Sequence, residues 1–139
     1  MRKTSAESAV DEKQVNAINP STISSKDLAW EIAKAADDKK AQDILILKVS
    51  DVSYLADYFV IVTGFSRTQL RAIADSIEEN LAEQFNRNPI RVSGKNEGSW
   101  IVQDYEDVIV HIFLPEEREF YNLEAFWGHA ERFEYTQPS

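Results

Sequence analysis

The stretch YFVIVTGFSRTQLRAIADSIEENLAEQF, residues 58–85, carries a strand pattern and a helix pattern in direct succession. Tyr58 to Thr63 form a continuous, mostly apolar run of strand length, which is typical of a strand buried on both faces. Gly64 ends the strand, and Ser66 can cap a helix with Gln69 at its third position. The helical part repeats apolar side chains at spacings of three and four: Leu70, Ile73, Ala74, Ile77, Leu81 and Phe85. A buried strand followed by a long amphipathic helix predicts a sheet with helices packed against it.

The residues before this stretch show the same two patterns in reverse order. Asp43 to Val49, DILILKV, are a second continuous aliphatic run and predict another buried strand. Ser24 and Asp27 match the S-x-x-D capping pattern, so a first helix is expected from there to about Lys39. Trp30 projects from the side opposite the apolar face of that helix. It either binds a partner or lies beneath the N-terminal residues, and the second interpretation is favoured.

The residues after position 85 predict three more strands and a last helix. Ile90 to Ser93 form a short strand, and a loop at residues 94–99 leads to two strands joined around residues 104–107. Pro115 suits the first turn of a helix that ends before Gly128. The order helix, strand, strand, helix, strand, strand, strand, helix predicts one mixed sheet of about five strands flanked by helices. The expected class is α/β, or α+β under stricter schemes.

The length of 139 residues fits one domain. Residues 1–22 are polar and aperiodic, so they are expected to be a flexible tail, with a single domain at 23–135 and a short tail at 136–139. No apolar run approaches the roughly 20 residues that span a bilayer, and no hydrophobic signal core begins the chain. The protein is therefore expected in the cytoplasm, without membrane contact. The lack of cysteine excludes disulfides, thiolate nucleophiles and cysteine metal sites.

The net charge of -9 is concentrated in the last third of the chain. Beyond residue 95, two arginines, Arg118 and Arg132, stand against ten carboxylates: Glu97, Asp104, Glu106, Asp107, Glu116, Glu117, Glu119, Glu124, Glu131 and Glu134. Nucleic-acid affinity comes largely from lysine and arginine at phosphates, so such a surface repels RNA and DNA and suits a basic protein. The alternative is that the acidity merely aids solubility, and charge alone favours that alternative.

No constellation in the sequence specifies a reaction or a cofactor. The strand-to-helix turn at residues 64–66 lacks both G-x-x-x-x-G-K-[ST] and G-x-G-x-x-G, so it predicts a capped turn and no nucleotide site. Nucleotidyltransferases share such a turn, but they need magnesium-binding carboxylates on the following strand, which here reads PIRVS. The remaining candidates for metal binding or acid-base chemistry are Asp104, Glu106, Asp107 and His111. Turn carboxylates are usually solvated and strand histidines usually packed, so no catalytic or metal site is assigned.

The predicted hairpin has the composition of a docking patch. Alternate residues of a strand share a face, so Trp100 and Val102 point to one side, and Asp104 continues that side. A large apolar anchor near Tyr105, rimmed by carboxylates such as Asp107, favours lysine and arginine on a partner. The alternative is that Trp100 and Val102 face a helix and belong to the core. The pattern alone leaves both interpretations open.

Three segments together resemble the ribosomal silencing factor family, also called RsfS or Iojap: ADYFVIVTGFSRTQLRAIADSIEE, EGSWIVQDYEDVIVHIF and PEEREFYNLEAFWG. The resemblance covers about residues 28–127. It includes DDKKAQDI before the first strand, W-x-x-x-D-Y-x-D-V-x-V-H across the hairpin, and REFYNLEAFW in the last helix. Glu106 departs from the family pattern, because many relatives have glycine there. Phe65 departs as well, where a small polar residue commonly follows the Thr-Gly pair.

The resemblance implies a translational repressor and not an enzyme. Such a protein binds a basic ribosomal protein on the subunit-joining face of the large ribosomal subunit and sterically blocks the small subunit, with little direct contact to nucleic acid. The family's fold is similar to that of nucleotidyltransferases without the catalytic carboxylates. Its docking surface carries over onto Trp100, Asp104 and Tyr105, and strand geometry adds Val102 and Asp107.

Two other functions stay open from the sequence. One is an assembly factor that binds the large subunit earlier in its maturation. The other is a divergent magnesium-dependent nucleotidyltransferase that uses Asp104, Glu106 and Asp107. An exposed Trp100 or Trp30 would also permit a homodimer, because a free apolar patch can pair with itself.

Overall fold

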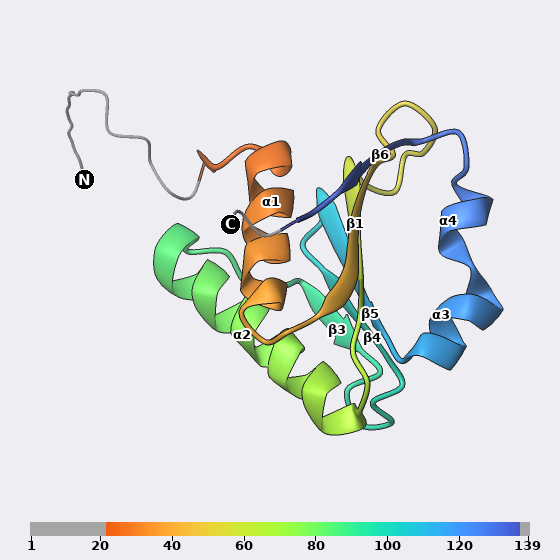
Figure 1. Ribbon diagram of the computed structural model, residues 1–139. Helices are drawn as coiled ribbons and strands as arrows, with labels where there is room; N and C mark the ends of the chain where they lie inside the picture. Colours follow the sequence, from red (N-terminus) through yellow and green to blue (C-terminus); the bar gives the residue numbers. More distant parts are fainter. Residues whose placement is uncertain (1–21, 137–139) are drawn as a thin grey trace, which may run out of the picture.

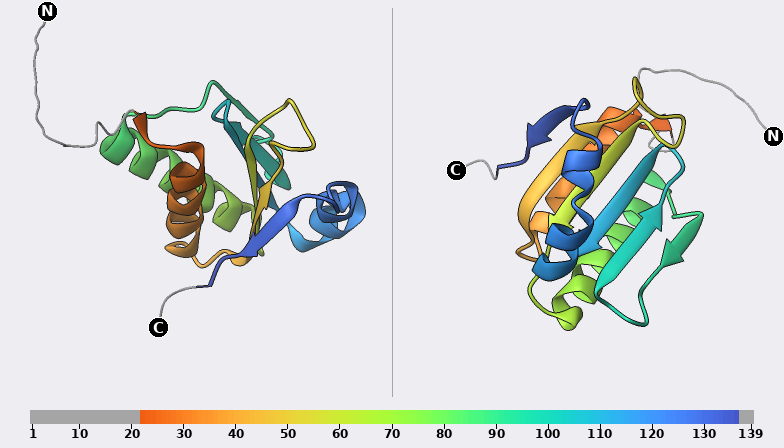
Figure 2. Two further views of the ribbon diagram at one scale, coloured as in Figure 1. Left: turned by 90° about the horizontal axis from the view of Figure 1, so that it is seen from above. Right: turned by 90° about the vertical axis from the view of Figure 1, so that its right-hand side faces the viewer.

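Residues 22–136, which the computed structural model describes, form a six-stranded sheet with helices on both faces (Figures 1 and 2). In chain order the elements are α1 (Ser25–Asp37), β1 (Gln42–Lys48), β2 (Tyr58–Thr63), α2 (Arg67–Phe85), β3 (Arg91–Ser93), β4 (Trp100–Asp104), β5 (Val108–Phe113), α3 (Pro115–Tyr121), α4 (Leu123–Phe126) and β6 (Glu131–Glu134). Helices α1 and α2 cover one face, while α3 and α4 lie on the other (Figure 1). The predicted α+β class with a mixed sheet is confirmed.

The sheet has the strand order β3-β4-β5-β2-β1-β6. Strands β2 and β5 run parallel, and the other neighbouring pairs run antiparallel. All six residues of β2 are buried, because this strand lies inside the sheet with helices above and below it. This arrangement explains why Tyr58–Thr63 is a continuous apolar run in the sequence instead of an alternation of apolar and polar residues.

The predicted helix starts are confirmed by their caps. The Ser24 hydroxyl accepts a hydrogen bond from the backbone N–H of Asp27 at 3.1 Å, and the Ser66 hydroxyl accepts one from Gln69 at 3.0 Å. Helix α1 ends at Asp37, two residues before the predicted end, and a turn follows in which Lys40 adopts a φ of 66°. Helices α1 and α2 therefore begin where a serine supplies an acceptor to the first turn.

Two apolar clusters pack on opposite faces of the sheet. The larger one lies between the sheet and helices α1 and α2, and Val60 and Val62 of β2 belong to it. The smaller one lies on the other face and contains Phe59 and Ile61 of the same strand, with Trp127 packed against it. Strand β2 thus contributes alternate side chains to both clusters.

Strand β6 was not predicted from the sequence. Its four residues, ERFE, are mostly charged and exposed, so they give almost no apolar periodicity. Phe133 nevertheless packs edge-on against Trp30 of α1 with 5.8 Å between ring centroids, and Tyr135 lies 6.3 Å from the same indole. Trp30 is therefore covered by the C-terminal strand. The predicted tails at 1–22 and 136–139 lie, apart from Thr22 and Thr136, outside the described residues.

The last predicted helix is broken in two. Helix α3 ends at Tyr121, Asn122 takes a left-handed conformation with φ 47°, and α4 continues only to Phe126. Asparagine adopts this conformation more readily than most residues, so it can turn the chain between two short helices. Figure 2 shows α3 and α4 crossing the β1 and β2 side of the sheet, with β4 and β3 to one side of them.

No helix among residues 22–136 is long and apolar enough to cross a membrane.

Candidate partner-binding surface on the open half of the sheet

Strand β4 presents Trp100, Val102 and Asp104 on the side of the sheet that carries α3 and α4. These three residues pair with Phe113, His111 and Ile109 of β5 in the antiparallel register. The two residues between them, Ile101 and Gln103, are fully buried toward α1 and α2. The alternation predicted from the sequence is therefore what the strand adopts.

The Trp100 indole lies along the sheet instead of projecting from it. It stacks on Phe113, with 4.8 Å between ring centroids and 26° between planes, and Tyr121 of α3 packs on it at 4.6 Å. Its Nε1–H donates a hydrogen bond to His111 Nδ1 at 3.2 Å. Three side chains therefore fix the orientation of the indole, and Trp100 as a residue remains partly exposed.

His111 is a buried, uncharged member of this cluster. It is 8% exposed, and burial lowers the pKa of its imidazole to about 4. An indole nitrogen can only donate, so Nδ1 must be the unprotonated nitrogen and Nε2 carries the hydrogen. Nε2 has no hydrogen-bond partner within residues 22–136, and the imidazole lies 5.2 Å from Phe59 in an edge-on arrangement. With Nδ1 bound to the indole and Nε2 carrying the hydrogen, the imidazole orients Trp100 and has no free nitrogen to accept another proton.

The hairpin turn separates the predicted site residues into two groups. Tyr105 is 1% exposed and points into the core on the opposite face, so its ring would have to leave the core to contact a partner. Asp107 forms an ion pair with Arg87 at 2.7 Å, and the same guanidinium donates to the Tyr105 carbonyl at 2.9 Å. Tyr105 is therefore enclosed by the molecule, whereas Asp107 is held at the turn by Arg87 with its side chain 29% exposed. Trp100, Val102 and Asp104 share the accessible face of β4.

The turn also gives Glu106 an unusual backbone conformation. Its φ is 79°, in the left-handed region, and its N–H donates to the Asp104 carboxylate at 2.8 Å. Glycine adopts this conformation without steric cost, whereas a residue with a Cβ does not. The departure from glycine noted in the sequence therefore falls at a position where the backbone favours glycine.

The carboxylates of the turn do not converge on one point. Asp104 binds the turn backbone, Asp107 binds Arg87, and Glu106 is exposed. Across residues 22–136 there is no group of three or more His, Asp or Glu side chains that could hold a metal ion.

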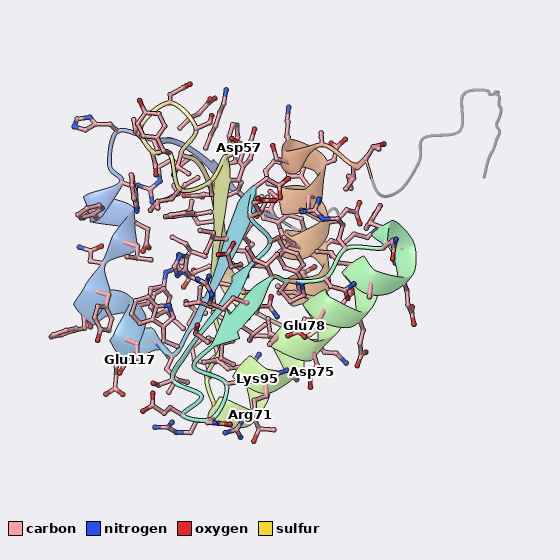
Figure 3. All side chains as sticks on the ribbon, turned by 180° about the vertical axis from the view of Figure 1, so that it is seen from behind. Asp57, Arg71, Asp75, Glu78, Lys95 and Glu117 are labelled. Carbon is pink, nitrogen blue, oxygen red and sulfur yellow. The ribbon has the colours of Figure 1, made fainter. Side chains whose placement is uncertain are left out.

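The loop before Trp100 is fastened to α2 by arginines that sequence patterns did not single out. Arg71 donates to the carbonyls of Lys95 at 3.2 Å and of Asn96 at 3.1 Å, and Arg67 donates to the carbonyl of Glu97. In Figure 3 the Lys95 side chain reaches Asp75 on α2, with 2.9 Å between Nζ and the carboxylate. These contacts hold the start of β4 against the helix. Charged residues on an exposed helix face give no sequence signal for such a role.

Gly94 opens this loop in a conformation that leaves no room for a side chain. Its φ is 83°, and a Cβ at this position would lie 2.0 Å from the Trp100 carbonyl oxygen. The close approach lets the loop fold directly onto the first residue of β4.

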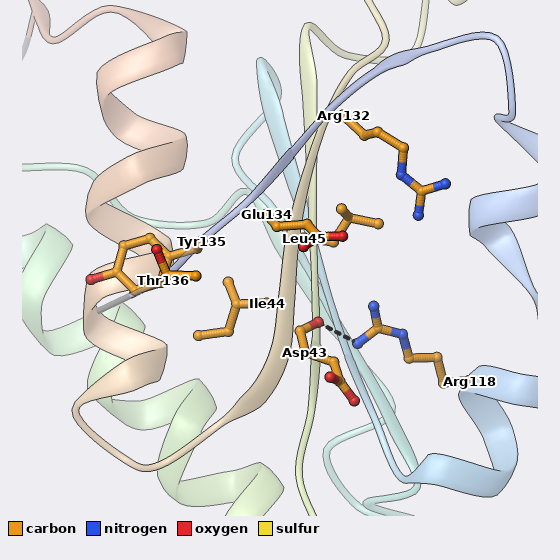
Figure 4. Close-up of a pocket in the computed structure, with 8 residues that line it drawn as sticks. All are labelled: Asp43, Ile44, Leu45, Arg118, Arg132, Glu134, Tyr135 and Thr136. Carbon is orange, nitrogen blue, oxygen red and sulfur yellow. Dashed lines mark hydrogen bonds between the residues drawn. The ribbon is translucent and has the colours of Figure 1, made fainter. Parts of the chain in front are cut away.

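A separate pocket of about 360 Å³ lies where β1 and β6 meet α3 (Figure 4). Arg118 and Arg132 line it, but so do the side chains of Asp43 and Glu134. The Arg118 guanidinium is already occupied, because it donates to the Asp43 carbonyl at 2.7 Å and to the Thr63 hydroxyl at 2.8 Å. The mixed charge and the occupied arginine give this pocket no clear ligand class.

Comparison with known proteins matches the fold and the sequence to one family. Residues 22–139 match the family described as ribosomal silencing factor during starvation, RsfS. The ribosomal silencing factor RsfS of Bacillus subtilis is 45% identical over 101 residues, which cover 70% of this chain and 82% of that protein. The mouse protein named mitochondrial assembly of ribosomal large subunit protein 1 is 31% identical over 91 residues, covering 64% of this chain and 40% of that protein.

A solved structure shows the same fold. The crystal structure of a protein from Chromobacterium violaceum superposes with a TM-score of 0.72 at 28% identity, covering 84% of this chain and 92% of the other. The family match spans most of the chain, including the β4–β5 hairpin and helices α3 and α4. The chain therefore belongs to the ribosomal silencing factor family.

Proposed function

We propose that this protein represses translation by binding a basic ribosomal protein on the subunit-joining face of the large ribosomal subunit. The accessible side chains Trp100, Val102 and Asp104 form the contact, and the small subunit is excluded sterically. The family assignment supports the ribosomal role. The observation that carries the choice of surface is the half-buried Trp100, whose indole is held in a fixed orientation on the strand face that it shares with Asp104.

An immobilised indole suits a binding anchor. A side chain that is already ordered loses little conformational entropy when a partner covers it, so more of its buried area contributes to affinity. Tryptophan is enriched among the residues that dominate interface energetics, and Asp104, at the other end of the same strand face, favours a cationic partner. Blocking needs no catalysis, because occupancy of the surface depends only on the concentration of the repressor relative to its dissociation constant.

The test is co-sedimentation with purified large ribosomal subunits. Trp100→Ala is expected to weaken binding by roughly tenfold or more, because it removes the anchor. Asp104→Lys should also weaken binding, because it places a cation opposite a basic partner. Glu83→Lys makes a matched charge change on the exposed side of α2 and should bind like the parent protein. Parental affinity of both Trp100→Ala and Asp104→Lys would contradict the proposed surface.

A role in assembly of the large subunit is the second candidate, and the name of the mouse relative favours it. The two roles differ in the particle that is bound. A repressor binds mature large subunits, and its loss leaves their protein content unchanged. Loss of an assembly factor makes incomplete large subunits accumulate. Gradient profiles of ribosomes from cells that lack the protein, followed by analysis of the protein content of each particle, separate the two.

A further inference from the structure

Helix α3 exposes aromatic side chains that lie outside the proposed contact on β4. Phe120 is 80% exposed and Tyr121 is 46% exposed, although both belong to a helix that lies on the sheet. Large aromatic side chains gain little from water contact, and an exposed pair on one short helix is characteristic of an interaction surface.

These rings continue the Trp100 cluster outward. Tyr121 packs on Trp100 with 4.6 Å between ring centroids, and Phe120 meets Tyr121 edge-on at 5.0 Å. We name Trp100, Tyr121 and Phe120 the aromatic ridge. It leads from β4 onto α3 without a polar side chain between successive rings. A partner that covers the indole of Trp100 therefore meets the ring of Tyr121 at the same time.

The accessible charges of helices α3 and α4 have one sign. Residues 115–126 contain a single cation, Arg118, against four carboxylates: Glu116, Glu117, Glu119 and Glu124. The Arg118 side chain is only 12% exposed and is turned inward, where it pairs with Glu124 at 3.1 Å and binds Asp43 and Thr63. The outer side of α3 therefore presents aromatic rings and carboxylates with no accessible cation among residues 115–126.

We propose that the aromatic ridge of Trp100, Tyr121 and Phe120 is one continuous docking surface for a lysine- and arginine-rich segment of the bound protein. Aromatic faces attract guanidinium and ammonium groups and cover the aliphatic parts of these long side chains. Glu116 and Glu119 are exposed on the same helix and supply carboxylates for these cations. The proposal rests on the proposed function for the identity of the partner, a basic ribosomal protein, and it adds α3 to the contact.

The chemistry of the ridge excludes two other kinds of occupant. Ribosomal RNA carries a phosphate charge on every nucleotide, and the carboxylates of α3 would repel it. The surface of an anionic membrane would be repelled in the same way. A cationic polypeptide is the class of partner that gains from both the rings and the charges.

The experiment measures the affinity of purified large ribosomal subunits for variants of the full chain. Phe120→Ser removes an exposed ring without opening the core, and roughly tenfold weaker binding is expected. Phe126→Ser is the matched control. Phe126 is 75% exposed on the neighbouring helix, and its ring contacts Trp127 at 5.0 Å instead of Trp100. This variant should bind within about twofold of the parent.

A second pair of variants separates the ring of Tyr121 from its hydroxyl. Tyr121→Phe keeps the ring on Trp100 and should bind like the parent, whereas Tyr121→Ala should weaken binding by roughly tenfold or more. Glu119→Lys tests the contribution of the carboxylates on α3. It should weaken binding more at low salt than at high salt, because salt screens the repulsion between the new lysine and a cationic partner. Far-ultraviolet circular dichroism and the melting temperature establish that each variant is folded.

The outcomes distinguish this inference from the function on which it rests. If Trp100→Ala loses binding while Phe120→Ser and Tyr121→Ala keep it, the hairpin is the contact and the ridge proposal is wrong. Equal losses in Phe120→Ser and Phe126→Ser would also overturn the ridge as defined. If none of these variants changes binding, the contact surface given under the proposed function fails together with the ridge.

Discussion

The pair formed by Trp100 and His111 shows how one hydrogen bond can determine the tautomer of a buried histidine. His111 accepts the indole N–H through Nδ1, and its ring is enclosed by Phe59 and Phe113 as well as Trp100. Protonation of Nδ1 would break that bond and place a positive charge in an apolar site. Burial and loss of the bond both oppose the charged form.

His111 should make stability depend on pH. Burial lowers the pKa of His111 in the folded protein to about 4, whereas an unfolded histidine titrates near 6.5. Below pH of about 6.5 the unfolded chain binds a proton that the folded protein does not, so the free energy of unfolding falls as the pH is lowered toward 4, by up to roughly 3 kcal/mol. Urea unfolding between pH 7 and pH 4.5 measures this slope. His111→Gln can still accept the indole hydrogen bond but cannot titrate, so its slope should be smaller.

Glu106 is a residue at which a single substitution should stabilise the protein. Relief of the left-handed conformation contributes roughly 1–2 kcal/mol, and the larger backbone entropy of glycine in the unfolded chain costs roughly 0.5–1 kcal/mol. Glu106→Gly is therefore expected to raise the free energy of unfolding by about 0.5–1 kcal/mol, as measured by urea titration. Glu79→Gly, at an exposed position inside α2, should lower it by about 1 kcal/mol. A destabilised Glu106→Gly variant would show that contacts of the glutamate outweigh its backbone conformation.

At the scale of the element, sequence patterns predicted the strands and helices whose signals lie within a few residues of each other. The β2–α2 unit was predictable because Gly64, the Ser66 cap and the apolar spacing act within a few residues of each other. The face shared by Trp100, Val102 and Asp104 followed from the two-residue period of a strand.

Elements that depend on distant contacts could not be predicted in the same way. Strand β6 is held by pairing with β1 and by Phe133 on Trp30, about a hundred residues earlier in the chain. The bond from Arg87 to the Tyr105 carbonyl at the hairpin turn joins residues 18 apart in the chain, and no local pattern indicates it. The contribution of Tyr121 to the surface around Trp100 required knowledge of how α3 lies on the sheet.

Arg118 joins α3 to three other elements, and its loss should be costly. The guanidinium binds the Asp43 carbonyl in β1, the Thr63 hydroxyl in β2 and the Glu124 carboxylate in α4. Arg118→Met keeps the length of the side chain but leaves the Glu124 carboxylate without its cation, so the free energy of unfolding should fall by about 2–3 kcal/mol. Arg118→Met together with Glu124→Gln removes the unpaired charge and should recover part of the loss. Chemical denaturation of both variants measures the two effects, and equal stability of Arg118→Met and the parent would contradict this role.

At the scale of the whole molecule, the net charge of -9 favours a basic protein partner over a nucleic acid, and the salt dependence of binding distinguishes the two. A protein that binds through six to ten phosphate contacts loses roughly 10³–10⁵ in affinity between 50 and 200 mM salt. Binding to a basic ribosomal protein through an aromatic anchor and a few carboxylates should weaken by less than about tenfold over the same range, because exposed charge pairs contribute little each. Sedimentation or interferometry with large subunits at several salt concentrations measures the slope. A steep slope would indicate direct contact with ribosomal RNA.

The two apolar clusters on opposite faces of the sheet are unequal in size. The face covered by α1 and α2 has the larger cluster, and the face that carries α3 and α4 has the smaller one. Helices α3 and α4 bury few side chains of their own and are held largely by Arg118 and by rings packed on the smaller cluster. They can therefore detach as a local cooperative unit while the larger cluster under α1 and α2 remains intact. The ring of Tyr121 would leave Trp100 in the same event, so the lifetime of the attached state sets an upper limit on how long the complete ridge persists between openings.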